Sequence, residues 1–302
     1  MATSTLYLRT PAKINLSLLV LGKRHDGYHE LLTEMVMIDL FDEILLERVS
    51  KPGIHLRLSG RPVDGDPKTN LVVRALTLLE ESVNKKGIKT SGGFAVDLAK
   101  KIPVGAGLGG GSSNAAIALW GGNRLLGRPL SMGEMEKIGR ALGSDVPFFL
   151  GGPRAMGVGR GDIIVPLPPS EPFIVLLWNP EIPLPTPSVY RALDPADLEF
   201  KGVVELTEKE RSNRIGSLLK SGDLVNSLEK PAIGLCPQIA DGIRFLEGYR
   251  PGNVRMTGSG PTVFARFDSR DKALGAAREM VGKLGGWTGV FEGLLAPSVP
   301  GV

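Results

Sequence analysis

The sequence has little of what several common classes of protein require. Its 302 residues include one cysteine, Cys236, and three histidines. A single cysteine excludes an internal disulfide and any metal site built from several cysteine ligands, so we interpret Cys236 as a small buried hydrophobic residue. The histidines and carboxylates show no grouping typical of a metal centre. We therefore predict no metal site made of such residues.

Long apolar runs and blocks of like charge are missing as well. No stretch approaches the roughly eighteen uninterrupted apolar residues of a membrane-spanning helix, and residues 1–16 lack the apolar core of a secretory signal. The formal net charge of +4 is spread along the chain, with no basic block interleaved with aromatic residues, which disfavours nucleic-acid binding. We therefore expect a cytoplasmic protein that binds neither nucleic acid nor a membrane.

Glycine, by contrast, is abundant, with 40 residues, and 42% of the chain is hydrophobic. Helix and strand patterns mix along the chain without an internal repeat, which predicts an α+β fold with antiparallel strand pairs. Thr69 or Asn70 is expected to cap one helix and Ser131 another. We predict strands at 5–10, 13–22, 42–49, 54–60, 93–103, 162–167 and 173–178, and helices at 69–87, 112–127, 131–143, 209–222, 236–248 and 269–285.

The composition changes near residue 152, where a stretch rich in glycine and proline begins. Such residues punctuate the chain between regular elements. We therefore predict two domains, 1–160 and 161–302.

The densest glycine cluster is PVGAGLGGGSS, residues 103–113, which lies between a predicted strand and a predicted helix. Gly105, Gly107 and Gly110 satisfy the G-x-G-x-x-G spacing of dinucleotide-binding proteins. The preceding strand alternates polar and apolar residues, however, and no acidic residue follows about 20 positions later. A nucleotide-binding loop of the Walker A type is excluded, because it needs a lysine where Ser112 stands.

A third interpretation requires neither motif. Glycines allow successive backbone N–H groups to approach a phosphate chain, and the helix that follows directs the positive end of its dipole at the same anion. Two serine hydroxyls can bind phosphate or Mg²⁺. The alternative on this stretch alone is a flexible loop followed by a serine cap.

Four stretches together resemble the GHMP kinases. The glycine run resembles the second motif of that family with two additional glycines. The segment PAKINLSLLVLGKRHDGYHEL (11–31) is similar to the N-terminal motif, GSDVPFFLGG (143–152) to the catalytic segment, and TGSGPTVFARF (257–267) to the third motif. They occur in the family's order and span nearly the whole chain.

The resemblance implies a two-domain fold. Its N-terminal domain would be like the second domain of ribosomal protein S5, its C-terminal domain ferredoxin-like, and the active site would lie between them. The segment 11–31 and the extended glycine run are most similar to one branch of the family. That branch uses ATP to phosphorylate the 2-hydroxyl of 4-diphosphocytidyl-2-C-methyl-D-erythritol in the non-mevalonate isoprenoid pathway. The departures are Ser227, where this branch often has aspartate, and Ser144, where alanine is common.

The resemblance also implies roles for individual residues. Asp145 corresponds to the catalytic aspartate, a general base within reach of the acceptor hydroxyl, and Lys13 to the catalytic lysine, which would pair with it. The turn 258–260 would close on the phosphates or on the acceptor. The acceptor would contact Asn15, Tyr28, His29, Thr186 and Tyr190, with cytosine stacked between Tyr28 and Tyr190.

ATP would be bound by the glycine run and by residues near the nucleoside, with Mg²⁺ as the accompanying ion. The expected ATP-binding residues are Asn70, Lys100, Pro103, Val104, Gly105, Ala106, Gly107, Leu108, Gly109, Gly110, Gly111, Ser112, Ser113 and Asn114. The expected assembly is a monomer or a weak homodimer.

Two other functions remain open at this point. One is another GHMP kinase, acting on homoserine, mevalonate or a sugar; the stretch GYHEL and the extended glycine run argue against it. The other is a nucleotide-binding module without catalysis, which the presence of both Lys13 and Asp145 disfavours.

Overall fold

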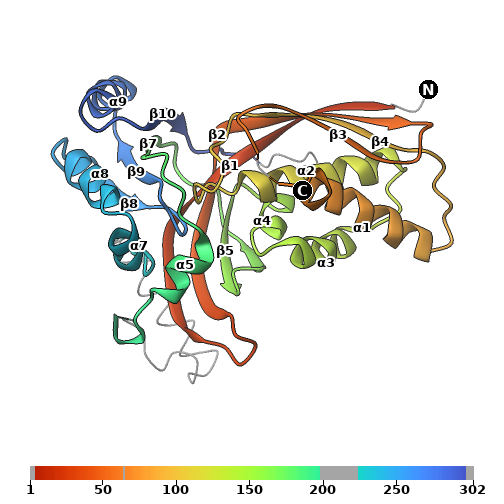
Figure 1. Cartoon of the computed structure of the whole chain (residues 1–302), viewed down its shortest axis with the longest axis horizontal. Helices are drawn as coiled ribbons and strands as arrows, with labels where there is room; N and C mark the ends of the chain where they lie inside the picture. The colour runs from red at the N-terminus through yellow and green to blue at the C-terminus, as the bar shows by residue number, and fades with distance from the viewer. Residues whose placement is uncertain (1–3, 64, 198–223, 297–302) are drawn as a thin grey trace.

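The folded protein contains two β-sheets that lie next to each other, and helices cover each of them (Figure 1). The structure is a computed structural model and describes residues 4–63, 65–197 and 224–296. Within these residues, no helix is long and apolar enough to cross a membrane.

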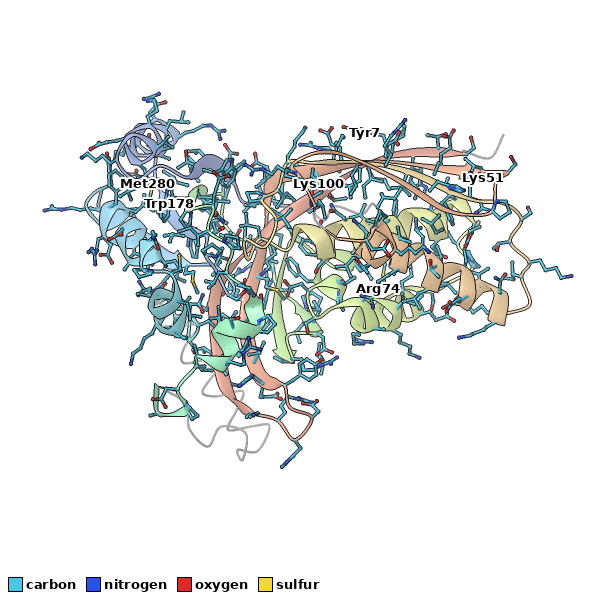
Figure 2. The ribbon with its side chains drawn as sticks, in the orientation of Figure 1. Tyr7, Lys51, Arg74, Lys100, Trp178 and Met280 are labelled. Carbon is cyan, nitrogen blue, oxygen red and sulfur yellow. The ribbon has the colours of Figure 1, made fainter. Side chains whose placement is uncertain are left out.

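The larger sheet has six strands. β2 (His29–Val49) is its central strand, with β1 (Thr5–Lys23) along one edge and β4 (Gly93–Lys100) and β5 (Arg154–Gly159) on different halves of the other. β3 (Gly53–Gly60) pairs with β4 in parallel, and β6 (Ile163–Pro166) pairs with β5. Tyr7 lies on the outer face of this sheet, whereas Lys100 lies on the face toward the helices (Figure 2).

The predicted strands 5–10 and 13–22 form one continuous strand, β1, rather than two. Pro11 lacks a backbone N–H, but it lies beside a bulge, where a missing ladder bond is tolerated. The partner strand β2 begins at His29, thirteen residues before the predicted start at Asp42. The resulting hairpin is long enough to extend over the second sheet.

Helices α1 (Leu71–Lys85), α2 (Gly110–Leu125), α3 (Met132–Leu142) and α4 (Val146–Leu150) pack together and against the larger sheet. The predicted caps are confirmed: the Asn70 side chain accepts from the Val72 N–H, and Ser131 forms a reciprocal capping box with Glu134.

The second sheet consists, in spatial order, of β10 (Trp287–Glu292), β7 (Ile174–Asn179), β9 (Val263–Phe267) and β8 (Asn253–Met256), and every neighbouring pair is antiparallel.

The predicted helices 236–248 and 269–285 are confirmed as α8 (Gln238–Glu247) and α9 (Arg270–Leu284). The predicted helix 209–222 lies outside the described residues. Two short 3₁₀ helices, Pro67–Thr69 and Pro195–Asp197, complete the regular structure of the described chain. The other described helices of the second half are α5 (Thr186–Arg191) and α7 (Glu229–Leu235).

The first sheet continues past residue 160, because β6 pairs with β5, and the second sheet begins with β7. We therefore propose that the division between the two domains lies in the segment 167–173. A buried cluster joins the two sheets: Ile14 and Val36 of the hairpin pack with Val175, Leu177 and Phe264. This shared core fixes the hairpin against the second sheet, and the predicted site residues of β1, Lys13 and Asn15, lie at that junction.

Candidate active site

A cavity of about 1150 Å³ lies at the junction of the two sheets. Its lining comes from the β1–β2 hairpin, the glycine run, the start of α4, helix α5 and the turn 258–259. All of the predicted catalytic, ATP-binding and acceptor-binding residues line it except Ser113, and of the predicted turn 258–260 Gly258 and Ser259 line it. The Ser113 side chain is fully buried, and its hydroxyl has no hydrogen-bond partner in the described structure. Helix α2 begins at Gly110, ahead of the predicted start near Ser112, and Ser113 lies on the face of the helix that packs into the core.

The glycine run is a loop with fixed anchors. Ala106 and Leu108 are buried in the cluster between the sheets, and the Leu108 carbonyl accepts from the Lys13 backbone N–H at 3.0 Å. Gly107 lies so close to the second domain that an added Cβ would be 2.5 Å from the Thr257 carbonyl. The loop is thus anchored at Ala106, Gly107 and Leu108.

The end of this loop is the beginning of α2. Gly109 is the residue before the helix and has a φ of 70°. The first backbone N–H groups of a helix have no partner within it, and those of Gly110, Gly111 and Ser112 belong to residues that line the cavity. Together with the helix dipole, they make this end of the cavity suited to an anion.

Lys13 and Asp145 meet at the floor of the cavity. The Lys13 ammonium lies 3.3 Å from Asp145 Oδ2, with side-chain exposures of 4% for the lysine and 35% for the aspartate. Asp145 immediately precedes α4, whose residues are all buried. The carboxylate is thus open to a ligand on one side and held by a rigid element on the other.

Asn15 connects this pair to both domains. Its Oδ1 accepts from the Lys13 ammonium at 2.5 Å, and its amide group donates to Thr33 Oγ1 at 2.7 Å. Thr33 in turn donates to the Ser17 carbonyl at 2.8 Å. The Asn15 backbone N–H donates to the Thr257 hydroxyl at 2.7 Å. Strand β1 is thereby linked to the glycine turn of the second domain.

The aromatic side of the cavity holds His29 and Tyr190. Their rings stack with centroids 5.0 Å apart, so the ring against Tyr190 is that of His29. Burial, with the charge of Asp145 adding, raises the pKa of the Tyr190 hydroxyl. Burial, with the charge of Lys23 adding, lowers the pKa of the His29 imidazole. Both side chains therefore favour their neutral forms.

The other predicted acceptor residues lie nearby. Tyr28 is 55% exposed, with the guanidinium of Arg160 4.8 Å from its ring centroid. The hydroxyls of Thr186, at the start of α5, and Ser259 are hydrogen-bonded at 2.7 Å. A nucleobase that stacks on the Tyr28 ring would therefore also lie near the positive charge of Arg160.

Three of the predicted ATP-binding side chains, those of Asn70, Lys100 and Asn114, already have partners. The Asn70 carbonyl oxygen caps α1. The Lys100 ammonium is buried and forms an ion pair with Asp42 and a hydrogen bond with Asn114. These contacts fix how the side chains lie at the wall of the cavity.

Comparison with known proteins agrees with this geometry. Residues 70–152 match the model of the GHMP kinase N-terminal domain, and residues 203–285 match that of the GHMP kinase C-terminal domain. A protein of Geobacter metallireducens, named 4-diphosphocytidyl-2-C-methyl-D-erythritol kinase, is 36% identical over 281 residues, which is 91% of this chain and 94% of that protein. A protein of the same name from Desulfotalea psychrophila is 39% identical over 87% of this chain and 85% of its own length.

The chain belongs to the GHMP kinases. A crystal structure of 4-(cytidine 5'-diphospho)-2C-methyl-D-erythritol kinase superimposes with a TM-score of 0.76 and 32% identity, covering 95% of this chain and 99% of that one. Homoserine kinase from Cytophaga hutchinsonii has a TM-score of 0.70 at 17% identity, with 98% of this chain and 96% of that chain covered, and so shares the fold. The predicted two-domain GHMP kinase fold is confirmed.

The sequence patterns missed several residues that hold the site of this GHMP kinase together. Thr33 and Asp42 are buried polar residues on β2. Thr257 and Asn226 form hydrogen bonds that hold the turn 258–260 in place. The Asn226 amide donates to the Met256 and Gly258 carbonyls at 2.7 and 2.9 Å. Polar residues within the apolar stretch 31–41 and at its end were the available signal, because buried polar groups need partners.

The two departures from the family pattern are compatible with the site. The Ser227 hydroxyl accepts from the Val20 N–H at 3.1 Å and so pairs with the edge of the hairpin. Ser144 lines the cavity beside Asp145.

Proposed function

We propose that the chain transfers the γ-phosphoryl group of ATP to the 2-hydroxyl of 4-diphosphocytidyl-2-C-methyl-D-erythritol, a step of the non-mevalonate isoprenoid pathway. The observation that supports this most directly is the pair Lys13 and Asp145, 3.3 Å apart. The pair lies between a helix N-terminus suited to phosphate and an aromatic pocket suited to a base. The names of the relatives that match nearly the whole chain give the acceptor.

In the proposed mechanism, Asp145 accepts the proton of the acceptor hydroxyl as that oxygen attacks the γ-phosphorus. The new oxygen–phosphorus bond forms while the bond from phosphorus to the β,γ-bridging oxygen breaks, and ADP leaves. Lys13, held by Asn15 Oδ1, directs its positive charge toward the negative charge that develops on the transferred group. In-line positioning therefore depends on the side chain of Lys13 being fixed.

The glycine run would bind the triphosphate through the backbone N–H groups at the start of α2. Mg²⁺ would neutralise phosphate charge there. Within the described chain, no three or more His, Cys, Asp or Glu side chains gather to hold a metal. This fits an ion held by phosphates, waters and one or two protein oxygens. Ser112 lines the cavity at the start of α2 with such an oxygen and would hold it.

The acceptor would occupy the aromatic side. Tyr28 offers an exposed ring face for stacking on cytosine, and His29, in its neutral form, can donate and accept at the edge of the base. Tyr190 and Thr186 on α5 would line the same subsite. Since His29 already stacks on Tyr190, cytosine would pack against Tyr28 and adjoin this pair.

The test is a transfer assay with γ-³²P-ATP and three acceptors: 4-diphosphocytidyl-2-C-methyl-D-erythritol, homoserine and mevalonate. Label should reach the diphosphocytidyl compound and not the other two. In the same assay, Tyr28→Ala should raise the KM for this acceptor and leave the KM for ATP unchanged. Absence of transfer to the diphosphocytidyl compound would overturn the proposal.

A cytoplasmic location and a monomeric or weakly dimeric state also belong to this proposal. Sedimentation velocity at two protein concentrations tests the second. A tight dimer at both concentrations would contradict it.

A further inference from the structure

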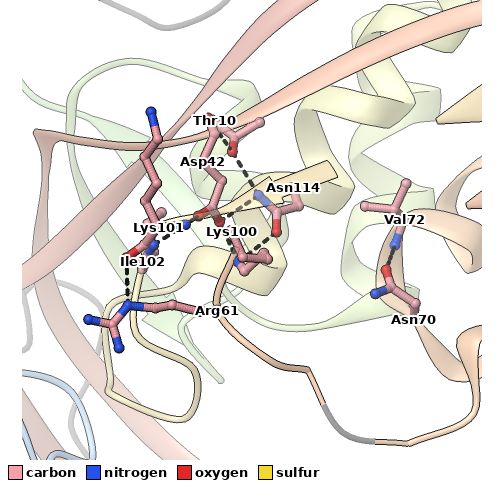
Figure 3. A network of polar contacts seen from close by, with 9 residues as sticks. All are labelled: Thr10, Asp42, Arg61, Asn70, Val72, Lys100, Lys101, Ile102 and Asn114. Carbon is pink, nitrogen blue, oxygen red and sulfur yellow. Dashed lines mark hydrogen bonds and ion pairs between the residues drawn. The ribbon is translucent and has the colours of Figure 1, made fainter. Parts of the chain in front are cut away.

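A network of buried polar groups lies beneath the glycine run, apart from Lys13 and Asp145 (Figure 3). At its centre is Asp42 of β2, whose side chain is fully buried. Its carboxylate accepts from the Lys101 and Ile102 backbone N–H groups at 2.6 and 2.8 Å, from the Asn114 amide at 3.0 Å, and from the Lys100 ammonium. Four donors from two segments thus converge on one side chain.

We infer that Asp42 is the positioning residue of the ATP-binding loop. It holds both ends of the glycine run, and it acts on the affinity for the nucleotide without touching the nucleotide. This inference rests on the proposed function, since it assigns the support of that same site.

The first end of the loop is the exit from β4. Strand pairing of β4 ends at Lys100, and the next two backbone N–H groups, of Lys101 and Ile102, both donate to Asp42 Oδ1. The Lys101 carbonyl accepts from Arg61 Nε at 3.0 Å. Asp42 therefore replaces the missing strand partner and fixes the direction in which the chain enters Pro103.

The second end of the loop is the start of α2, where Gly110 begins the helix and Asn114 follows one turn later. Asn114 donates to Asp42 and to the Thr10 hydroxyl at 2.7 Å, and its carbonyl accepts from the Lys100 ammonium at 2.9 Å. The helix start lies directly on this network, because a Cβ at Gly110 would be 3.3 Å from Lys100 Nζ. The side chains of Asp42, Lys100 and Asn114 therefore fix the position of the N-terminus of α2 relative to the larger sheet.

Charge makes the arrangement sensitive to substitution. A buried carboxylate with four donors is satisfied as an anion, and Lys100 balances its charge. Removing that charge leaves a buried ammonium without its counter-ion. The two loop ends would then separate, and the backbone N–H groups would lose their alignment toward a triphosphate.

The experiment compares Asp42→Asn with the wild-type chain in steady-state kinetics and in binding of a non-hydrolysable ATP analogue. The KM for ATP and the Kd of the analogue should rise about ten-fold or more, while the KM for the acceptor stays within about two-fold. Hydrogen–deuterium exchange of the segment 101–111 should become faster. An analogue Kd within two-fold of wild type in folded Asp42→Asn would overturn the inference.

The matched control is Glu34→Gln. Glu34 lies on the same strand and is also largely buried in an ion pair, with Arg154 at 2.7 Å, but it does not contact the loop. This variant should keep the analogue Kd of the wild type even if it melts at a lower temperature. An equal loss of affinity in both variants would show general destabilisation and contradict the inference.

Thr10→Val provides the test if Asp42→Asn does not fold. It removes only the hydroxyl at the edge of the network and should raise the analogue Kd about two- to five-fold; no change would overturn the inference. If the wild-type chain binds the analogue but transfers no phosphoryl group to the acceptor, the proposed reaction fails. The binding data still decide the role of Asp42.

Discussion

Lys13 Nζ lies 2.5 Å from Asn15 Oδ1 and 3.3 Å from Asp145 Oδ2. One oxygen comes from the same strand, β1, and the other from the residue that precedes α4. The ammonium is therefore held between the larger sheet and its covering helices. Its position depends on how these two elements pack.

Asp145→Asn tests the general base. The amide keeps the size of the side chain but cannot take the proton, so kcat should fall by a factor of about 10²–10⁴. The KM for ATP should stay within about two-fold, because the lost interaction belongs to the transition state. Steady-state kinetics with both substrates measure this. A kcat within ten-fold of wild type would remove Asp145 from the role of base.

Thr33→Val tests the orientation of Asn15. Because the Thr33 hydroxyl donates to the Ser17 carbonyl, it must accept from the Asn15 amide, which directs Asn15 Oδ1 to Lys13. Valine is nearly isosteric but leaves that amide unsatisfied, at a cost of about 1–3 kcal/mol in the free energy of unfolding. We expect kcat to fall about ten-fold. Urea unfolding and kinetics measure the two effects.

Thr33→Ser is the matched control. Serine keeps the hydroxyl and loses only a methyl group, so kcat should remain within about two-fold of wild type even if some stability is lost. If serine lowers kcat as far as valine does, packing of the methyl group is what matters, and the orientation argument fails.

His29 predicts a pH dependence of stability. Burial and Lys23 lower its pKa in the folded chain below the ordinary value of about 6.5. Between these two pKa values the unfolded chain binds more protons, so the free energy of unfolding rises with pH across that window and falls as pH decreases through it. His29→Gln should therefore lose less stability than wild type between pH 7.5 and 5.5. Urea unfolding of both chains at these pH values measures it; equal losses would contradict the assignment.

The motifs predicted which residues gather around the cavity better than they predicted the contacts that hold those residues in place. Lys13, Asp145 and the glycine run lie around one cavity, as expected from the order of the four motifs. Thr33 and Asp42 act through hydrogen bonds to segments far away in the sequence. A single sequence contains no signal for such pairings beyond the burial of a polar residue in an apolar strand.

The local patterns had the same limits in the fold. The caps Asn70 and Ser131 depend on neighbours within three residues, and both were predicted. The length of the β1–β2 hairpin depends on a bulge beside Pro11 and on packing against the second sheet. Ser113 was predicted to bind ATP, but its side chain lies on the buried face of α2, which begins at Gly110. The glycine-rich sequence does not indicate where this helix begins or which of its faces packs into the core.

Gly109→Ala tests the contact between the loop and the catalytic lysine. A Cβ at Gly109 would lie 2.9 Å from both Lys13 Cγ and Phe149 Cζ, so the lysine stem must shift from its position beside Asp145. The left-handed φ of 70° adds about 1–2 kcal/mol of backbone strain. Gly127→Ala, at a φ of 83° with open space around it, has the strain without the contact. Both variants should melt at a lower temperature, but only Gly109→Ala should lose kcat, by about ten-fold or more, because only it displaces the ammonium. Equal kcat values in the two variants would mean that the lysine stem yields without moving its charge.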